Sequence, residues 1–347
     1  MHAERETARQ PPEASGGRGT PGLPLTRAAE VLVTGASGFI GAALCRALSD
    51  AGYQVRRALR SLPASEADLH SRAFVVGDIG SHTNWAAALA GARYVVHLAA
   101  RTHVMRETAA DALAEYRRIN VEGSRRLIEH AVAAGVQRFV FMSSIKVNGE
   151  ATFGCPYTEA DAPAPKDAYG ISKWEAEQAL AQAGDAGGIE IVILRPPLVY
   201  GPGVKGNFLR LLSMVARRLP LPFAALENRR SLIYVDNLAA AAIASLAAPY
   251  ARWRTYLVSD GEDISTPGLV RALALALDAR PRLFACPPSV LRTVATLAGK
   301  AEEFERLAGS LQVDTSRIAN ELGWRPHCTL AEGLAETARW YRCLFKR

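Results

Sequence analysis

Short apolar runs alternate with helical stretches along the chain from Glu30 to Pro196. The runs are apolar throughout, which is typical of strands whose two faces are both buried. Strands that alternate with helices form parallel sheets through right-handed crossovers, with helices on both faces. The sequence therefore predicts a doubly wound parallel α/β fold, with strands at 31–33, 55–59, 74–76, 94–98, 139–142 and 191–194 and helices at 39–48, 85–89, 121–134 and 169–183.

The pattern loosens after Pro196. We expect a turn at 200–206, a helix at 207–218, an irregular stretch at 219–230, strands at 232–235 and 256–258, and mainly helices from Thr266 onward. Such a region predicts a smaller, mostly helical lobe over the carboxyl edge of the sheet, where ligands bind in doubly wound folds. The predicted sheet domain spans 30–200 and is completed by 229–258, and the predicted substrate lobe comprises 201–228 and 259–347.

Composition narrows the class of protein. Hydrophobic residues make up 49% of the 347 residues, enough for a large core, and the net charge of +7 is carried by scattered arginines. A nucleic-acid-binding protein usually gathers its charge into a stripe, so we expect attraction for small phosphate-bearing molecules and no nucleic-acid partner. The longest apolar run, 238–248, is shorter than the roughly 20 residues that cross a bilayer, so no membrane partner is expected.

The two remaining global signals are the N-terminal segment and the cysteines. Residues 1–29 are rich in Pro, Gly, Ala, Arg and Glu and lack the apolar core of a signal peptide, which predicts a disordered tail. The five cysteines are widely spaced and show no metal-ligand spacing. We therefore expect free thiols, no metal site and a cytoplasmic location.

A glycine-rich segment directly follows the first predicted strand. Gly35 and Gly38 would permit a tight turn and close approach to a pyrophosphate, and Gly41 would let the first helix pack against the strand. Backbone N–H groups at the start of that helix would face the phosphates. The alternative is a glycine turn without a ligand, but its place between strand and helix favours a dinucleotide site. The predicted contacts are Gly35, Ser37, Gly38, Phe39, Ile40 and Gly41.

The end of the second predicted strand bears on the choice of cofactor. NAD-binding folds usually place an acid there for the ribose 2′-hydroxyl, but the segment 55–61 contains none. Arg60, helped by Ser61, could hold the 2′-phosphate of NADP(H). A merely solvated Arg60 is the alternative, so NADP(H) is favoured and NAD(H) remains open. Asp78 could accept a hydrogen bond from the adenine amino group or cap a helix.

A tyrosine and a lysine four residues apart form the second anchor. On a helix, Tyr169 and Lys173 would share one face. To exchange protons near neutrality, the tyrosine pKa must fall by roughly 3 units from about 10. A neighbouring ammonium and an oxidised nicotinamide would both favour that fall. An exposed helix pair is the alternative interpretation.

A serine completes the candidate catalytic set. Ser144 follows the predicted strand 139–142, so its hydroxyl would lie at the carboxyl edge of the sheet and bond the reacting oxygen. Ser143 would point to the other side, because side chains alternate along a strand. Ser144, Tyr169 and Lys173 together predict proton transfer coupled to hydride transfer.

With these motifs in order, residues from about Glu30 to Tyr341 resemble the extended short-chain dehydrogenases/reductases, the NAD-dependent epimerase/dehydratase family. The resemblance rests on 34–41, 77–79, 97–100, 120–123, 143–144, 169–173 and 195–202. It implies a Rossmann-type sheet and an enzyme with Ser144, Tyr169 and Lys173 as catalytic residues. Further cofactor contacts implied by the resemblance are Asp78, Ile79, Leu98, Ala99, Ala100, Asn120, Tyr169, Lys173 and Pro196.

Later segments resemble the nucleotide-sugar branch of that family. Gly206-Asn207-Phe208 and the strand bearing Arg230 are similar to its diphosphate contacts, and 313–317 with 321–324 match its C-terminal pattern. The resemblance implies substrate contacts from Ser144, Asn207 and Arg230, with a nucleoside-diphosphate sugar as partner. Three departures stand against strict 4-epimerase chemistry: Asn148 and Leu198 replace frequent family residues, and the acid after strand two is missing.

The resemblance implies NAD(P)-dependent chemistry at C4 of a nucleoside-diphosphate hexose. The two leading activities are a 4-keto-sugar reductase, slightly favoured by Arg60, and a 4-epimerase, either one serving the synthesis of surface-polysaccharide sugars. A dehydratase is disfavoured, because Ile145-Lys146 stands where that branch has an acid pair. Two alternatives remain: an NADPH reductase of small ketones or aldehydes, and a non-catalytic NADP-binding protein. A homodimer is compatible with the sequence.

Overall fold

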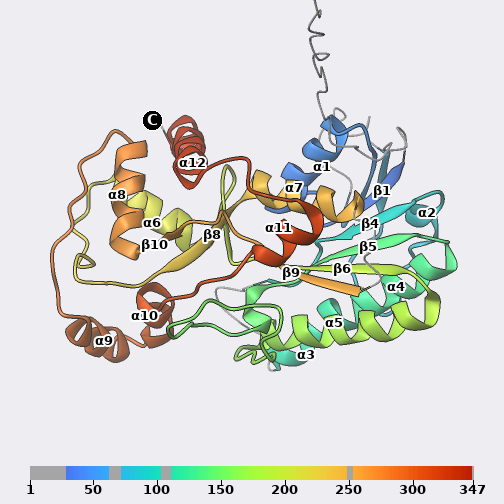
Figure 1. Cartoon of the computed structure of the whole chain (residues 1–347), viewed down its shortest axis with the longest axis horizontal. Helices are drawn as coiled ribbons and strands as arrows, with labels where there is room; N and C mark the ends of the chain where they lie inside the picture. Colours follow the sequence, from blue (N-terminus) through green and yellow to red (C-terminus); the bar gives the residue numbers. More distant parts are fainter. Residues whose placement is uncertain (1–28, 62–71, 103–110, 248–252, 346–347) are drawn as a thin grey trace, which may run out of the picture.

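A seven-stranded parallel sheet forms the larger part of the molecule (Figure 1). The computed structural model describes residues 29–61, 72–102, 111–247 and 253–345. The strand order is β3-β2-β1-β4-β5-β6-β9, and every neighbouring pair is parallel, which confirms the predicted doubly wound fold. The strands are β1 (Glu30–Thr34), β2 (Gln54–Leu59), β3 (Arg72–Val75), β4 (Tyr94–His97), β5 (Arg138–Met142), β6 (Glu190–Arg195) and β9 (Trp253–Leu257).

Helices cover both faces of this sheet, which explains why the inner residues of its central strands are apolar. In β1, Val31 and Val33 belong to one buried cluster and Leu32 to the other. The first cluster lies under α1 (Phe39–Asp50), α7 (Val235–Ala247) and α11 (Ser316–Leu322), and the second under α2 (Ala86–Leu89), α4 (Gly123–Ala133) and α5 (Ala168–Gly187). α4 is preceded by α3 (Ala112–Tyr116) and a π-helical turn (Arg117–Glu122).

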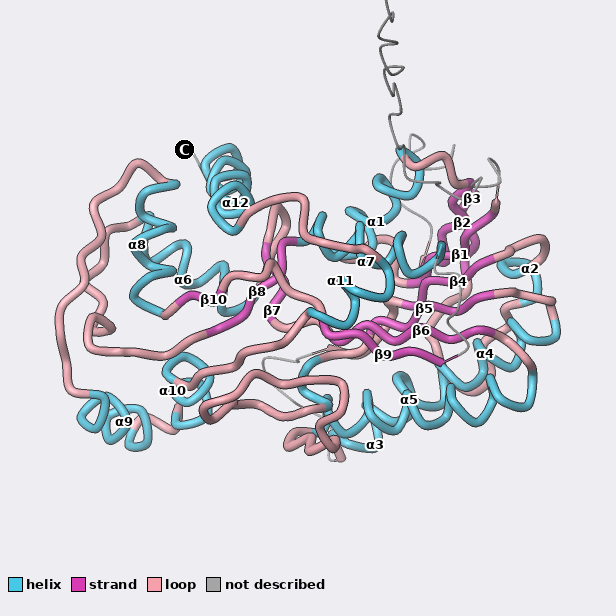
Figure 2. The backbone as a smooth tube through the Cα atoms, viewed as in Figure 1, coloured by secondary structure: helices cyan, strands magenta, loops and turns pink. Residues whose placement is uncertain are grey.

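A second, three-stranded sheet lies between the large sheet and the outer helices (Figure 2). Its order is β10 (Asp263–Ile264), β8 (Arg230–Tyr234), β7 (Leu198–Tyr200). Helices of this part are α6 (Gly206–Ala216), α8 (Thr266–Ala276), α9 (Pro288–Leu297), α10 (Ala301–Ala308) and α12 (Leu330–Phe345).

The structure differs from the sequence-based expectation at this second sheet. Residues 198–200 and 230–234, which we assigned to the sheet domain, pair with each other instead of with the large sheet. Among the described residues of the predicted segment 229–258, α7 packs on the large sheet and β9 pairs with β6. The exact domain boundaries remain our proposal. The predicted disordered tail falls almost wholly within residues 1–28, outside the described residues.

Candidate active site

The glycine turn after β1 forms a cradle in which the glycine positions have no room for a side chain. Gly35 adopts a left-handed φ of +65°, and a Cβ there would lie 2.9 Å from the backbone N of Ala99. A Cβ at Gly41 would lie 2.1 Å from the carbonyl oxygen of Gly35. Gly38 is the N-cap of α1, and no side chain of the described residues caps that helix start. Its N–H groups are thus arranged to receive an anion, and the turn fits a dinucleotide pyrophosphate.

Arg60 and Asp78 lie together at the end of the sheet near β2 and β3. Their side chains form an ion pair at 3.0 Å and are 81% and 76% exposed. An exposed pair of this kind contributes about 0–1 kcal/mol and opens readily. Asp78 does not cap the next helix, which was one of its two predicted roles, because the N-cap of α2 is Trp85.

The other predicted cofactor residues border the same carboxyl edge. Leu98 and Ala99 donate backbone hydrogen bonds of 3.2 and 3.1 Å to the Thr34 hydroxyl, which holds the segment after β4 against the glycine turn. The remaining residues are Ser37 in the turn, Phe39 and Ile40 at the start of α1, Ile79 after β3, Ala100 after β4 and Pro196 after β6.

Asn120 lies on the π-helical turn with its amide fully engaged. It accepts a hydrogen bond from the Arg101 N–H at 2.8 Å and donates to the Arg101 carbonyl at 3.1 Å and to Ser172 Oγ at 2.9 Å. Ser172 in turn donates to the carbonyl of Tyr169 at 2.8 Å. The buried Asn120 side chain thus ties the segment after β4 to α5.

His97 is a buried residue to which the sequence analysis assigned no role. Its Nδ1 lies 2.6 Å from Thr34 Oγ1 and its Nε2 lies 2.9 Å from Ser124 Oγ. Since Thr34 Oγ1 already accepts two backbone N–H groups, its own proton goes to Nδ1, and Nε2–H donates to Ser124. Burial and the nearby Lys173 lower the pKa of His97 to about 3. The imidazole is therefore a neutral link between β1 and α4.

Two of the three predicted catalytic residues, Ser144 and Tyr169, meet where β5 ends and α5 begins. Asp167 caps α5 through the Gly170 N–H at 2.7 Å and so places Tyr169 in the first turn. The side chain of Ser144 hydrogen-bonds that of Tyr169. Ser144 Oγ also accepts the Lys146 N–H at 3.2 Å. Lys173 follows one turn later on α5.

The electrostatics of this set differ from the predicted ones. Burial raises the pKa of Tyr169, Asp167 raises it further, and the Ser144 hydrogen bond lowers it. Lys173 does not provide the expected decrease, because burial lowers its own pKa from 10.5 to about 7. Its Nζ lies 3.9 Å from the centre of the Phe141 ring. Without added positive charge at the site, Tyr169 stays a neutral phenol at neutral pH.

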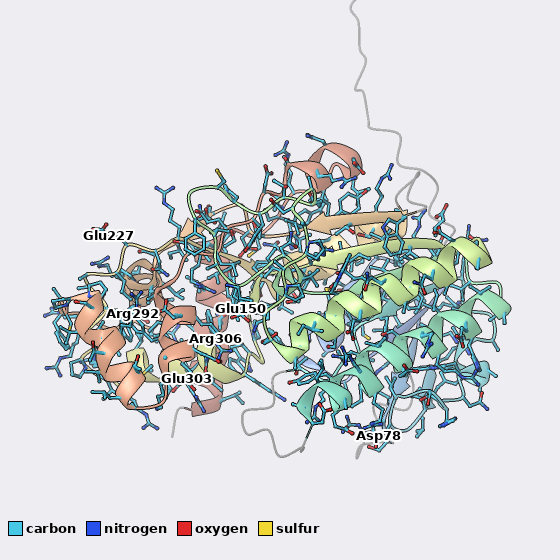
Figure 3. All side chains as sticks on the ribbon, turned by 90° about the horizontal axis from the view of Figure 1, so that it is seen from below. Asp78, Glu150, Glu227, Arg292, Glu303 and Arg306 are labelled. Atoms are coloured by element: carbon cyan, nitrogen blue, oxygen red, sulfur yellow. The ribbon has the colours of Figure 1, made fainter. Side chains whose placement is uncertain are left out.

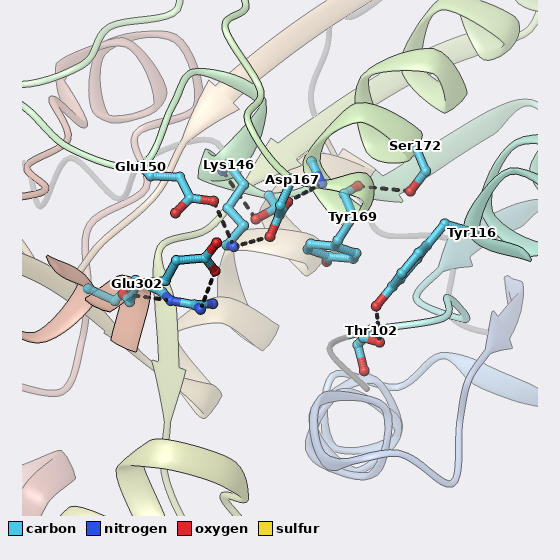
Figure 4. A network of polar contacts seen from close by, with 11 residues as sticks. Thr102, Tyr116, Lys146, Glu150, Asp167, Tyr169, Ser172 and Glu302 are labelled. Atoms are coloured by element: carbon cyan, nitrogen blue, oxygen red, sulfur yellow. Dashed lines mark hydrogen bonds and ion pairs between the residues drawn. The ribbon is translucent and has the colours of Figure 1, made fainter. Parts of the chain in front are cut away.

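Lys146 is a second cation beside Tyr169, and the sequence analysis had treated it only as a departure from the dehydratase pattern. Its Nζ lies 3.0 Å from Glu150 and pairs with Asp167 (Figure 4). Asp167 is the acid that raises the Tyr169 pKa. Lys146 therefore offsets part of the negative charge next to the phenol.

The other two predicted substrate contacts, Arg230 and Asn207, lie in the part of the molecule that contains the second sheet. Arg230 begins β8 and donates from Nη1 to the Gly309 carbonyl at 2.8 Å. Burial lowers the pKa of Arg230, and the negative charge of Glu150 opposes that decrease. Figure 3 shows Glu150 near the middle of the molecule, where the two lobes meet. Asn207 is exposed in the first turn of α6.

The described residues were also compared with the requirements of a metal site and of a membrane span. Within the described ranges, His, Cys, Asp and Glu side chains form no group of three or more suited to holding a metal ion. No helix in the same ranges combines the length and apolar character needed to cross a bilayer.

Comparison with known proteins gives consistent matches over most of the chain. The chain is 42% identical over 312 residues to a UDP-glucose 4-epimerase of Vibrio cholerae, covering 89% of this chain and 94% of that protein. It shares its fold with a UDP-glucuronic acid 4-epimerase of Bacillus cereus solved with NAD (TM-score 0.74, 23% identity, 91% and 97% coverage). A dTDP-glucose 4,6-dehydratase of Streptomyces venezuelae, also solved with NAD, gives a TM-score of 0.71 at 27% identity, with 90% and 97% coverage.

The sequence model of the NAD-dependent epimerase/dehydratase family matches residues 31–258, more than half of the chain. This range contains the glycine cradle, Ser144, Tyr169 and Lys173. The predicted resemblance is thereby confirmed: the chain is an enzyme that belongs to the NAD-dependent epimerase/dehydratase family of extended short-chain dehydrogenases/reductases.

Proposed function

We propose that this enzyme acts at C4 of a nucleoside-diphosphate hexose, most simply as a 4-epimerase. The observation that carries the proposal is the hydrogen bond between Ser144 and Tyr169. It lies at the carboxyl edge of the parallel sheet, which is also the edge that carries the glycine cradle. The similarity to the Vibrio cholerae UDP-glucose 4-epimerase, which extends over both lobes, supports the substrate class.

The side chains have distinct roles in this proposal. A dinucleotide held by the glycine cradle supplies a nicotinamide that can accept and return a hydride. Ser144 donates a hydrogen bond to the C4 oxygen, and Tyr169 takes up or returns the proton of that oxygen. Lys173 supplies a buried positive charge one turn away. Arg230 and Asn207 bind the diphosphate from the second lobe.

A 4-keto-sugar reductase is the second candidate, and Arg60 is the observation that favours it. A reductase must exchange its cofactor at each turnover, which suits NADPH. Arg60 lies directly after β2, and its only ion-pair partner among the described residues is the exposed Asp78. Breaking that pair costs little, so Arg60 is available to a 2′-phosphate.

One experiment separates these activities. The purified protein is incubated with UDP-, GDP- and dTDP-hexoses and their 4-keto forms, with NAD(H) or NADP(H), and the products are identified. Interconversion of C4 epimers without net cofactor consumption supports the epimerase. Stoichiometric NADPH oxidation by a 4-keto sugar supports the reductase. Turnover of small ketones or aldehydes alone, or no turnover with intact cofactor binding, would replace both by the remaining alternatives.

Cofactor preference gives a first prediction. If Arg60 grips a 2′-phosphate, the contact is worth roughly 1.5–3 kcal/mol, so the wild type should bind NADPH about 10–100-fold more tightly than NADH. Arg60→Ala should remove the preference by weakening NADPH binding alone. Fluorescence titration of both reduced cofactors measures this, with Arg46→Ala on α1 as the control. Tighter binding of NADH by the wild type would contradict it.

Substrate binding gives a second prediction. Arg230→Ala should raise KM for the nucleotide sugar by roughly 10–100-fold, because a charge-assisted hydrogen bond to the diphosphate is lost. Cofactor affinity should not change. The exposed neighbour Arg229 provides the matched control, since Arg229→Ala keeps the strand and removes a cation of the same kind. Equal KM values for the two variants would show that Arg230 does not contact the substrate.

A further inference from the structure

A buried ion pair lies directly behind the catalytic residues. Glu177 follows Lys173 by one turn of α5, and Arg195 ends β6. Arg195 donates from Nε to Glu177 Oε1 at 3.0 Å and from Nη2 to Oε2 at 2.6 Å. The two side chains are only 5% and 1% exposed. Neither residue belongs to the catalytic or cofactor set already described.

The pair is connected to the strand end that carries Ser144. Ser143 Oγ donates to Glu177, and the Ser143 N–H donates to the Leu194 carbonyl at 2.8 Å. The hydroxyls of Ser143 and Ser144 are therefore fixed on opposite sides, one toward Glu177 and one toward Tyr169.

The loop after Ser144 is held by the same pair. Arg195 Nη1 donates to Asn148 Oδ1 at 2.9 Å, and Asn148 Nδ2 donates to the Thr158 carbonyl at 3.1 Å. The Ile145 N–H donates to the Pro196 carbonyl at 3.0 Å. Glu177 and Arg195 thus fix the residues on both sides of Ser144.

A contribution to the stability of the fold does not by itself explain why a charged pair is buried at this position. Desolvating a carboxylate and a guanidinium costs several kcal/mol per ion, and well-packed apolar residues often replace such pairs without loss of stability. The position of the pair suggests a functional reason, because its carboxylate, Glu177, lies one helical turn from the buried Lys173.

We propose that Glu177 is a positioning residue of the active site, whose carboxylate orients the strand end bearing Ser144 and balances the charge of the Lys173 ammonium. This proposal rests on the proposed catalytic roles of Ser144 and Lys173 but not on the identity of the sugar. Glu177 would act on the substrate through Ser144 and Lys173 and would not contact it.

The charged and titratable groups around Lys173 define the expected pH effect. β4 contributes His97, which is neutral, and β5 contributes the uncharged Phe141 ring. α5 contributes the neutral Tyr169 and the charged Glu177, and β6 contributes Arg195 behind Glu177. Burial lowers the Lys173 pKa to about 7, and Glu177 opposes that decrease. Removing the carboxylate should therefore lower the Lys173 pKa further, so Lys173 should lose its proton at lower pH.

The test compares Glu177→Gln with Glu177→Asp and with the control Glu175→Gln, which removes a carboxylate from α5 that pairs with Arg117 instead. Two readouts are followed from pH 5.5 to 10: kcat/KM with the sugar identified by the screen, and NADH affinity by fluorescence titration. In Glu177→Gln the alkaline limb of both should move to lower pH by on the order of one unit. Glu177→Asp should largely restore it, and Glu175→Gln should leave it in place.

Ser143→Ala isolates the second part of the proposal, because it removes the link to Ser144 and keeps the Glu177 charge. It should lower kcat by roughly 2–10-fold, the worth of one hydrogen bond, with the alkaline limb unmoved. If Glu177→Gln does not fold, the double variant Glu177→Gln/Arg195→Met replaces it, because this variant leaves no unpaired buried charge. An alkaline limb that does not move in the folded variant would overturn the proposal. The NADH titration gives this answer even if no sugar nucleotide is a substrate.

Discussion

Tyr169→Phe is expected to lower turnover by about 10²–10⁴-fold, the usual contribution of a general acid–base group. The change removes one oxygen, whose hydrogen-bond partner is the Ser144 side chain. Because burial raises the pKa of the phenol, the tyrosine is neutral in the free enzyme, and the loss of its hydroxyl leaves no buried charge behind. Cofactor affinity and the free energy of unfolding should therefore change little. Steady-state kinetics and NADH titration measure the two effects separately.

Tyr116 provides the matched control for this prediction. Its ring lies 6.2 Å from that of Tyr169, and its hydroxyl donates to the Thr102 carbonyl at 3.0 Å rather than to Ser144. Tyr116→Phe should keep most of the turnover. If Tyr169→Phe retains more than about a tenth of the wild-type rate, Tyr169 is not the acid–base group.

Local sequence patterns predicted the parts of the site that depend on short segments. The glycine cradle follows from Gly35 and Gly41: a side chain at Gly41 would collide with backbone of the same turn, and one at Gly35 with the backbone of Ala99 after β4. Tyr169 and Lys173 share a helix face because four residues make about one turn. The parallel pairing of the strands was also predicted, because strands that alternate with helices form parallel sheets.

Two features of the site depend on contacts between distant parts of the chain and were not predicted from the sequence. The low pKa of Lys173 comes from burial over Phe141, a residue of another element. The ion pair between Glu177 and Arg195 joins residues 18 positions apart, and spacing on one helix cannot predict it.

Short elements were missed for a different reason. β10 has two residues and β7 has three, which is too few for an alternation of polar and apolar residues to be visible. The π-helical turn that carries Asn120 likewise has no signature in hydrophobic periodicity. Regular patterns identify long elements, whereas the second sheet and the turn are stabilised by their neighbours.

Lys173, to which we assign a role in the proposed chemistry, should make the folded enzyme less stable, and the Lys173→Met variant tests this expectation. Lys173 is 2% exposed, and its pKa falls from 10.5 to about 7 on folding. At 1.4 kcal/mol per unit, keeping its proton below pH 7 costs on the order of 4–5 kcal/mol. Methionine has a similar length and no charge, so the variant should lose turnover and gain stability.

The pH dependence of this gain identifies its source. Below pH 7, both the folded and the unfolded chain hold the Lys173 proton, and the wild type carries the full cost of the buried ammonium. Between about pH 7 and 10.5, the unfolded chain binds more protons than the folded one, so the stability of the wild type rises with pH relative to the variant. Urea unfolding at pH 6 and pH 9.5 should therefore show that Lys173→Met is much more stable than the wild type at pH 6 and only slightly more stable at pH 9.5.

The exposed Lys166 gives the control, since Lys166→Met should change the free energy of unfolding by no more than about 0.5 kcal/mol at either pH. A Lys173→Met variant that is no more stable than the wild type at pH 6 would mean that Lys173 is stabilised as an ammonium by its neighbours, against the burial that this structure shows.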